Sequence, residues 1–274
     1  MKKETPTVLL ARSIHWPLKV AMGGNVCSTD AIVDFCDRML KVAEFSDYPN
    51  AHNGLQVANS GKITCLGAAV DANRMSIEMA TAAGIDMLLV HHGLFWGRSL
   101  PISHRRRENY KLLLDNDIAV YSVHLPLDCH PEIGNNALIM NELGILPIQH
   151  LPCEHGFTMP IGKYNHPRKV LKETLEVLFP RIIELEFGDV DIGRVLVCSG
   201  GGGGIIAAME NISFDCVITG EAPRHFFDFA YEHGLNAYIC GHYATEVFGI
   251  RALAQKISDK FNIPWFWIEE NCPL

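Results

Sequence analysis

Residues 63–90 read ITCLGAAVDANRMSIEMATAAGIDMLLV, which is the clearest fold signal in the chain. The apolar runs at 63–70 and 85–90 have the length and composition of buried strands. Between them, residues 76–83 predict a helix that ends at Gly84. A strand, a helix and a second strand in this order form a β-α-β unit, which is typical of a parallel sheet covered by helices.

The same alternation continues on both sides of this unit. Up to residue 145, the pattern predicts helices at 29–44, 105–116 and 136–143 and a strand at 118–123. Prolines interrupt the middle of the chain, where the pattern predicts a helix at 168–178 between short strands near 157–159 and 182–187. After residue 193, it predicts strands at 195–198, 216–219, 237–240 and 265–268 and helices at 206–209, 224–233 and 245–261.

Two successive halves of this kind predict an α/β fold with two similar lobes, at residues 27–145 and 146–274. The last strand either stays in the second lobe or returns to the first. The functional site is expected in the cleft between the lobes. Residues 1–26, whose apolar stretch is too short for the core of a signal peptide, are expected to form a poorly ordered extension.

The composition is that of an ordinary globular protein, with 48% hydrophobic and 20% charged residues among 274. Asp and Glu number 31 against 23 Lys and Arg, a formal net charge of -8 that gives no signal for nucleic-acid binding. No apolar run approaches the ~20 residues of a membrane helix. Nine cysteines without a C-x-x-C pair indicate reduced thiols, and therefore a cytoplasmic protein.

Three motifs rich in metal-ligating residues follow predicted strands. They are HHGLFW at 91–96, VHLPLD at 123–128 and GHYATE at 241–246. Functional groups gather at the carboxyl ends of strands in open α/β sheets, so we expect the motifs to converge. Their imidazole and carboxylate side chains are His91, His92, His124, Asp128, His242 and Glu246.

Five of these side chains make up the predicted ligand set: His91, His92, Asp128, His242 and Glu246. Imidazole and carboxylate suit zinc, manganese, iron and nickel. A structural zinc takes four ligands and is often thiolate-rich, so five nitrogen and oxygen ligands fit a site for two ions better. Water shared between the two ions would then be the nucleophile.

Each of these residues also has a structural explanation. A histidine at a strand end often only hydrogen-bonds the backbone, and a His-x-x-x-Glu pair such as His242 and Glu246 is often an exposed charge pair. His124 is either a catalytic proton-handling group or a histidine that bonds a backbone carbonyl. His130 and His225 are weaker candidates for the same cleft.

Three other segments carry less specific signals. Five glycines at 200–204 follow Ser199 between a predicted strand and helix, where they form either a phosphate-binding turn or a turn set by packing. The three arginines at 105–107 indicate a solvated helix face more than a guide for anions. Glu221 is either a cavity acid or a charge at a helix start.

With NGLQV at 53–57 and GNN at 134–136, the three motifs resemble those of the NIF-three-like family of dinuclear-metal proteins. That family includes YbgI-type members and is also labelled GTP cyclohydrolase type 2 homologue. The resemblance runs from about Cys27 to the C-terminus and matches the short form without an inserted central domain. It implies that the five predicted ligands hold two divalent ions, with zinc, iron, manganese and nickel all open. It also implies a toroidal homohexamer whose metal sites face an internal cavity.

The function expected from the residues and the resemblance is metal-dependent hydrolysis of a small molecule, with nucleotides as candidate substrates. Opening of the GTP ring at C8 with loss of formate, as the family label implies, and phosphoester cleavage both fit these residues. In either reaction, His124 is the predicted catalytic group. The alternative is a non-catalytic ring-shaped metal-binding protein that acts as a scaffold, a metallochaperone or a regulatory partner.

Overall fold

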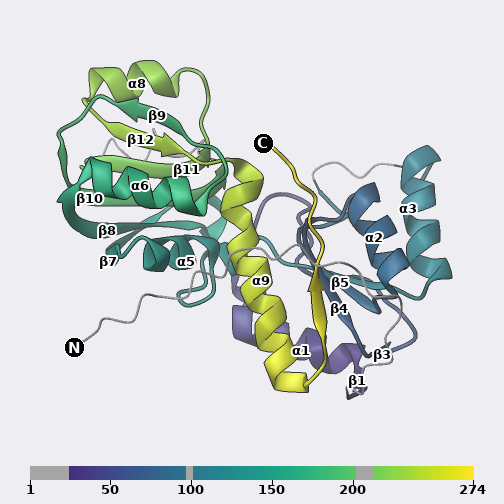
Figure 1. Cartoon of the computed structure of the whole chain (residues 1–274). Helices are drawn as coiled ribbons and strands as arrows, with labels where there is room; N and C mark the ends of the chain where they lie inside the picture. The colour runs from purple at the N-terminus through teal and green to yellow at the C-terminus, as the bar shows by residue number, and fades with distance from the viewer. Residues whose placement is uncertain (1–24, 97–100, 202–212) are drawn as a thin grey trace.

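The computed structural model describes residues 25–96, 101–201 and 213–274 (Figure 1). Most of the predicted extension at 1–26, and the predicted helix at 206–209, lie outside these residues. The chain folds as a mixed α/β protein around two large sheets, which confirms the predicted fold class. Every helix within the described ranges is too short or too polar to span a lipid bilayer.

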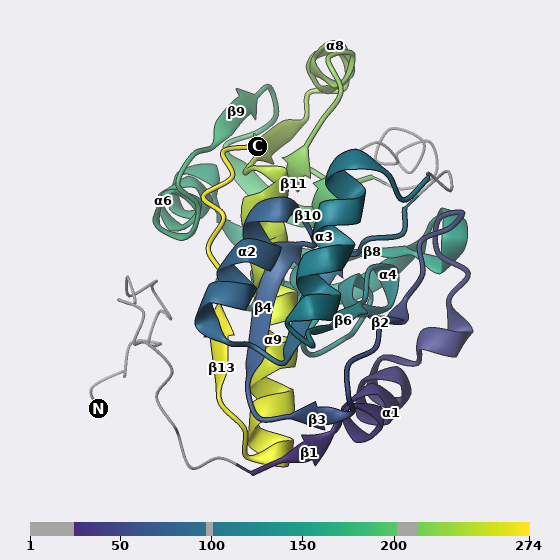
Figure 2. The ribbon, with the colours of Figure 1, turned by 90° about the vertical axis from the view of Figure 1, so that its right-hand side faces the viewer.

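The first sheet contains the predicted β-α-β unit. Its strand order is β13-β4-β5-β6-β2, with β2 Gly54–Val57, β4 Leu66–Asp71, β5 Met87–His92, β6 Ala119–Ser122 and β13 Trp265–Trp267. The first four strands in that order run parallel, and β2 is antiparallel to β6. β13 returns from the end of the chain to pair with β4, as Figure 2 shows. Two short strands, β1 Cys27–Ser28 and β3 Lys62–Ile63, form a separate antiparallel pair.

Helices cover both faces of the first sheet. One face packs against α2 Arg74–Ala83 and α3 His104–Asp115, and the other against α1 Thr29–Leu40 and α9 His242–Phe261. The start and end of α2 follow from the local sequence, because Asn73 caps it and Gly84 ends it with a φ of 67°. Since both faces are covered, β4 and β5 consist almost entirely of buried residues.

The second sheet is formed by residues 146–239. Among the described residues its strand order is β7-β8-β10-β11-β12-β9, with β7 Leu146–Pro152, β8 Thr158–Pro167, β9 Ile183–Glu186, β10 Asp191–Gly201, β11 Cys216–Glu221 and β12 Asn236–Ile239. β10, β11 and β12 run parallel, and the other strands are antiparallel to their neighbours. One face packs against α5 Asn135–Glu142 and α6 Arg168–Leu178, and the other against α8 Phe226–Glu232.

Helix α9 packs against both sheets and links them (Figure 1). Near its start, Ala244 and Phe248 join the core of the second sheet. Farther along, Ile250, Leu253 and Ile257 join the core of the first sheet. The first turns of α9 therefore lie where the two sheets meet. The division into lobes at residue 145, and the cleft between them, stay predictions.

Several elements differ from their predicted bounds for physical reasons. The strand predicted at 85–90 continues to His92, because this residue still pairs with Asp71 of β4. α9 begins at His242 rather than at residue 245, because Gly241 turns the chain directly into the helix with a φ of 94°. The middle of the chain, which prolines interrupt, begins with the strand β7, and β7 tolerates its two prolines because it lies at the edge of the sheet. The short strand β2 was not predicted.

Candidate metal centre

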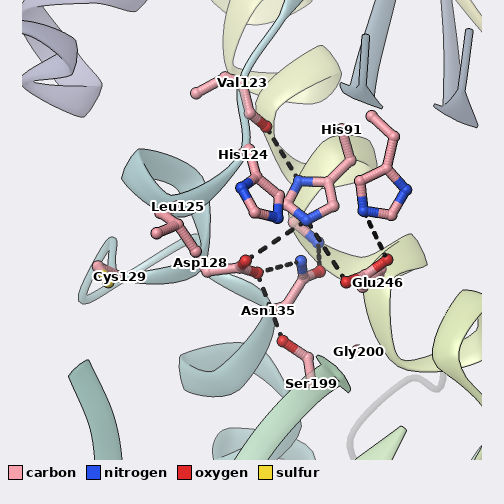
Figure 3. A network of polar contacts seen from close by, with 12 residues as sticks. His91, Val123, His124, Leu125, Asp128, Cys129, Asn135, Ser199, Gly200 and Glu246 are labelled. Carbon is pink, nitrogen blue, oxygen red and sulfur yellow. Dashed lines mark hydrogen bonds and ion pairs between the residues drawn. The ribbon is translucent and has the colours of Figure 1, made fainter. Parts of the chain in front are cut away.

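The carboxyl ends of parallel strands from both sheets meet at one place. β5 ends there in two histidines, β6 leads into His124 and the short helix α4 Leu125–Asp128, and β12 leads into α9. The structure brings together all six side chains expected to converge, and the contacts of His91, Asp128 and Glu246 are seen in Figure 3. We call this group the histidine–carboxylate cluster; its members are His91, His92, His124, Asp128, His242 and Glu246.

Glu246 lies at the middle of the cluster. Its Oε1 is 3.6 Å from His91 Nε2 and 3.2 Å from His242 Nε2, and its Oε2 is 3.4 Å from His92 Nε2. Asp128 Oδ2 lies 3.4 Å from His91 Nε2. Both carboxylates and His91 are buried, so charge has to be balanced within the cluster rather than by water.

All four histidines use Nδ1 to bond a group outside the cluster. The partners are the Val123 carbonyl for His91 at 2.9 Å, Asp71 for His92 at 3.0 Å, Asp47 for His124 at 2.9 Å and Glu221 for His242 at 3.3 Å. Because these oxygens accept, Nδ1 carries a proton, and a ring in its neutral form presents its Nε2 lone pair to the cluster. Metal-binding histidines are commonly held in this way.

The spacing within the cluster suits metal ions better than hydrogen bonds. The nitrogen–oxygen distances run from 3.2 to 3.6 Å. Hydrogen bonds of this type span about 2.7–3.2 Å, whereas two ligands on one tetrahedral ion with bonds near 2.1 Å lie about 3.4 Å apart. His91 Nε2 and Glu246 Oε2 are also buried without a hydrogen-bond partner among the described residues. The donor set and its unpaired atoms therefore fit a divalent ion.

Two overlapping groups of potential ligand atoms are present. The ligand atoms of His91, His92 and His124 lie within 4.8 Å of one another, and so do those of His92, His242 and Glu246. His124 thus lies as close to the other imidazoles as a ligand would, although the sequence analysis assigns it a catalytic role. The arrangement can hold metal ions.

The two buried carboxylates of the cluster favour positive charge on the groups beside them. Burial would lower the pKa of His91, but Asp128 and Glu246 hold it well above its ordinary value. Burial would raise the pKa of Glu246, yet the neighbouring histidines hold it well below. The Glu246 carboxylate, 3.2 Å from Nε2 of His242, raises the pKa of His242 to about 9. A divalent cation would supply positive charge to these carboxylates in place of protons on the imidazoles.

Asp128 is oriented by the GNN segment. Asn135 donates from Nδ2 to Asp128 Oδ1 at 2.8 Å, and its own Oδ1 accepts from the Gly249 amide of α9 at 2.6 Å. Ser199 adds a longer contact of 3.4 Å from its hydroxyl to Asp128 Oδ1 (Figure 3). With Oδ1 engaged in this way, Oδ2 faces His91 and the cluster.

Asp47 supports the cluster and could not be identified from the sequence. It is almost completely buried and accepts hydrogen bonds from His124 Nδ1, from Asn53 Nδ2 and from the Leu125 amide. Burial would raise the pKa of Asp47, but His124 and the amide donors lower it, so the group is a carboxylate. Asn53 also accepts from the His124 amide at 2.7 Å, which gives the NGLQV motif a structural role.

Gly200 forms one wall of the cluster. Its φ is 63°, and a Cβ at this position would overlap Glu246 Oε1. Its amide donates to Thr245 Oγ1 at 2.9 Å, and the Ser199 amide donates to Asn136 Oδ1. These two amides are therefore engaged within the protein, while residues 202–204 of the predicted phosphate loop lie outside the described part of the chain.

The remaining sequence candidates lie at different places. His130 accepts hydrogen bonds at Nδ1 from two backbone amides. It also lines a cavity of about 530 Å³ beside Asp128. His225 is exposed at the start of α8. Among the three arginines at 105–107, the last pairs with Glu108 on the exposed side of α3, as expected for a solvated face.

The fold and the cluster together define an α/β protein with a buried histidine–carboxylate group able to hold metal ions. The chain belongs to the Duf34/NIF3 (NGG1p interacting factor 3) family, whose model matches residues 27–273. This confirms the family resemblance drawn from the motifs.

Known relatives match nearly the whole chain. GTP cyclohydrolase 1 type 2 homolog of Deinococcus radiodurans is 37% identical over 251 residues, which cover 89% of this chain and 93% of that protein. The protein of the same name in Escherichia coli is 38% identical over 242 residues, or 86% and 90% of the two chains. The crystal structure of TTHA1606 from Thermus thermophilus has a TM-score of 0.81 at 31% identity and covers 90% of this chain and 100% of its own. Protein ybgI, of unknown function, has a TM-score of 0.83 at 33% identity with the same coverage.

Proposed function

We propose that this protein is a metal-dependent hydrolase that acts on a nucleotide-like small molecule at a centre of two divalent ions. The observation that carries the proposal is the central position of Glu246, which turns one carboxylate oxygen toward His91 and His242 and the other toward His92. A carboxylate placed between two sets of imidazoles suits a bridge between paired ions. The name shared by the curated relatives, GTP cyclohydrolase 1 type 2 homolog, supports a nucleotide as the substrate class.

The proposed ligands form two groups that share Glu246, because the ligand atoms of His92, His242 and Glu246 lie within 4.8 Å of one another and His91 lies 3.4 Å from Asp128. His91 and Asp128 would hold one ion, and His92 and His242 the other, with Glu246 shared. When bound, such ions make water a nucleophile near neutral pH and polarise the atom under attack. The metals remain open among zinc, iron, manganese and nickel, because imidazole and carboxylate accept all four.

His124 is the proposed proton-transfer group. Its Nδ1–H is engaged by Asp47, so Nε2 is the atom that accepts a proton. The Asp47 carboxylate stabilises the imidazolium that forms, and it also keeps the ring in one orientation. Cleavage at a purine C8 and cleavage of a phosphoester both require such a proton carrier, and we propose hydrolysis without choosing between them.

The test combines metal content with turnover. Purified protein is analysed for metal by mass spectrometry and assayed against a panel of nucleotides, together with Asp128→Asn and, as a control, Asp115→Asn at an exposed position of α3. We expect turnover with the wild type and the control, and its loss in Asp128→Asn. A protein that binds metal reversibly and hydrolyses nothing on the panel would instead favour the metallochaperone or scaffold function.

We also propose the toroidal homohexamer that the family resemblance implies. Native mass spectrometry of the full chain tests it, with a six-subunit mass as the expected result. A monomer or dimer at micromolar concentration would contradict this assembly without affecting the proposal for the metal centre.

A further inference from the structure

Two half-exposed aromatic side chains stand beside the histidine–carboxylate cluster. Tyr48 and Trp96 are each 47% exposed, and their ring centroids lie 6.0 Å apart. The Trp96 ring is 4.8 Å from the His124 ring and 5.9 Å from the His92 ring, and the Tyr48 ring is 5.8 Å from that of His124. Both rings therefore keep large surfaces open to solvent while they contact the imidazoles of the proposed metal centre. We call this pair the aromatic pair.

The backbone under each ring is fixed by a polar side chain. The Tyr48 amide donates to Asp47 Oδ1 at 2.6 Å, and this is the carboxylate that holds His124. The loop that leads to Trp96 is held by Gln56, whose Oε1 accepts from the Leu94 amide at 2.6 Å. Recognition sites gain precision when supporting hydrogen bonds lock them in place. Tyr48 is thus tied to the carboxylate that orients His124, and the segment just before Trp96 is held by Gln56.

The chemistry of the surroundings favours a planar ring as the ligand. Aromatic faces bind either cations or other flat rings. Divalent ions in the cluster would repel a cationic ligand a few ångströms away. Among the described residues, the ion pairs around the cluster join histidines to acids and include no lysine or arginine that would hold a phosphate. A ring that stacks needs no such charge.

We propose that Tyr48 and Trp96 form a stacking site that binds the planar heteroaromatic ring of the substrate and positions it over His92 and His124. The proposal rests on the proposed function for the identity of the reaction centre. It adds that the substrate is recognised through its ring. Stacking accepts every nucleobase, because each has a π-face.

Isothermal titration calorimetry of metal-loaded protein tests this proposal. The probes are AMP, GMP, CMP and UMP, with ribose 5-phosphate as the matched compound without a base. We expect the nucleotides to bind at least about fivefold more tightly than ribose 5-phosphate. Trp96→Ala and Tyr48→Ala should each weaken nucleotide binding by about fivefold to 150-fold, while Trp96→Phe retains most of it. Tyr231→Ala, which removes an exposed ring from α8, is the control and should change nothing.

Metal content, measured in every variant, separates loss of stacking from loss of the metal centre. Equal binding of ribose 5-phosphate and all four nucleotides would overturn the proposal. So would unchanged nucleotide affinity in Trp96→Ala and Tyr48→Ala variants that carry the wild-type amount of metal. Failure of the proposed function has a different signature: wild-type protein would bind nucleotides through the aromatic pair but hydrolyse none of them.

Discussion

Asp47 accepts a hydrogen bond from His124 Nδ1 at 2.9 Å, across 77 positions of the sequence. The carboxylate is buried and is held in turn by the Asn53 side chain and the Leu125 amide. This arrangement fixes the orientation and the tautomer of His124, whose Nε2 is left for a proton or a metal ion. Polar groups around the cluster, brought there by the tertiary fold, therefore hold its side chains in place.

Asp47→Asn is therefore expected to weaken the function of His124. An amide cannot stabilise the imidazolium, so we expect kcat/KM for the hydrolysed nucleotide to fall by about 10- to 100-fold. An unchanged kcat/KM in Asp47→Asn, measured with the nucleotide that the wild type hydrolyses, would show that the pair is only structural.

His124→Gln distinguishes a proton carrier from a metal ligand. If His124 transfers protons, hydrolysis should fall by about 100- to 10,000-fold while the metal content stays at the wild-type value. Metal content measured by mass spectrometry on the same preparation decides between the roles. Loss of an ion together with activity would assign His124 to the metal instead.

Gly200→Ala is expected to disrupt the cluster, because residue 200 packs directly against Glu246. The new Cβ would overlap Glu246 Oε1, and the left-handed backbone costs an alanine about 1–2 kcal/mol. We expect at least about tenfold weaker metal binding and a lower thermal midpoint. Gly201→Ala is the matched control, because its Cβ would lie 3.7 Å from Glu221 Oε1 in ordinary contact. Equal metal affinity in both variants would contradict the role given to Gly200.

The buried carboxyl group of Glu270 should make the stability of the protein depend on pH. Burial, with Asp71 nearby, raises the pKa of Glu270 from 4.5 to about 7. Between these values the folded protein binds more protons at this carboxyl than the unfolded chain does, so the free energy of unfolding falls as pH rises. Glu270→Gln should remove this fall. The free energy of unfolding of the variant, compared with that of the wild type, should therefore be up to about 3 kcal/mol higher at pH 8 than at pH 5.

Urea unfolding of metal-free protein at pH 5 and pH 8 measures this effect without interference from metal binding. Glu142→Gln, at an exposed position near the end of α5, is the control and should show the pH dependence of the wild type. A Glu270→Gln variant that loses stability between pH 5 and pH 8 as steeply as the wild type would refute the assignment.

The parallel core of both sheets could be predicted from the sequence because its strands are buried on both faces. β4 and β5 consist of apolar residues, and the intervening helix has a cap and a terminal glycine. β7 could not be predicted, because six of its seven residues are exposed and no alternation of apolar residues marks it. β2 has only four residues, too few for a periodic signal.

The cluster was predictable because its members follow directly on buried strands or lie one turn apart on a helix. The groups that orient the histidines could not be predicted, because they are distant in sequence from the residues that they contact. Asp47 and Asp71 reach His124 and His92 through tertiary contacts alone. Gly200 belongs to a glycine run that is visible in the sequence, but its proximity to Glu246 depends on how β10 packs against α9.

We propose that the histidine–carboxylate cluster holds a pair of cations around Glu246. Anomalous diffraction from crystals of metal-loaded protein, recorded at the absorption edges of zinc, iron, manganese and nickel, tests it most directly. We predict two peaks about 3.5–4 Å apart, on either side of the Glu246 carboxylate. Peaks elsewhere, or a loaded protein without anomalous density among these side chains, would contradict the claim.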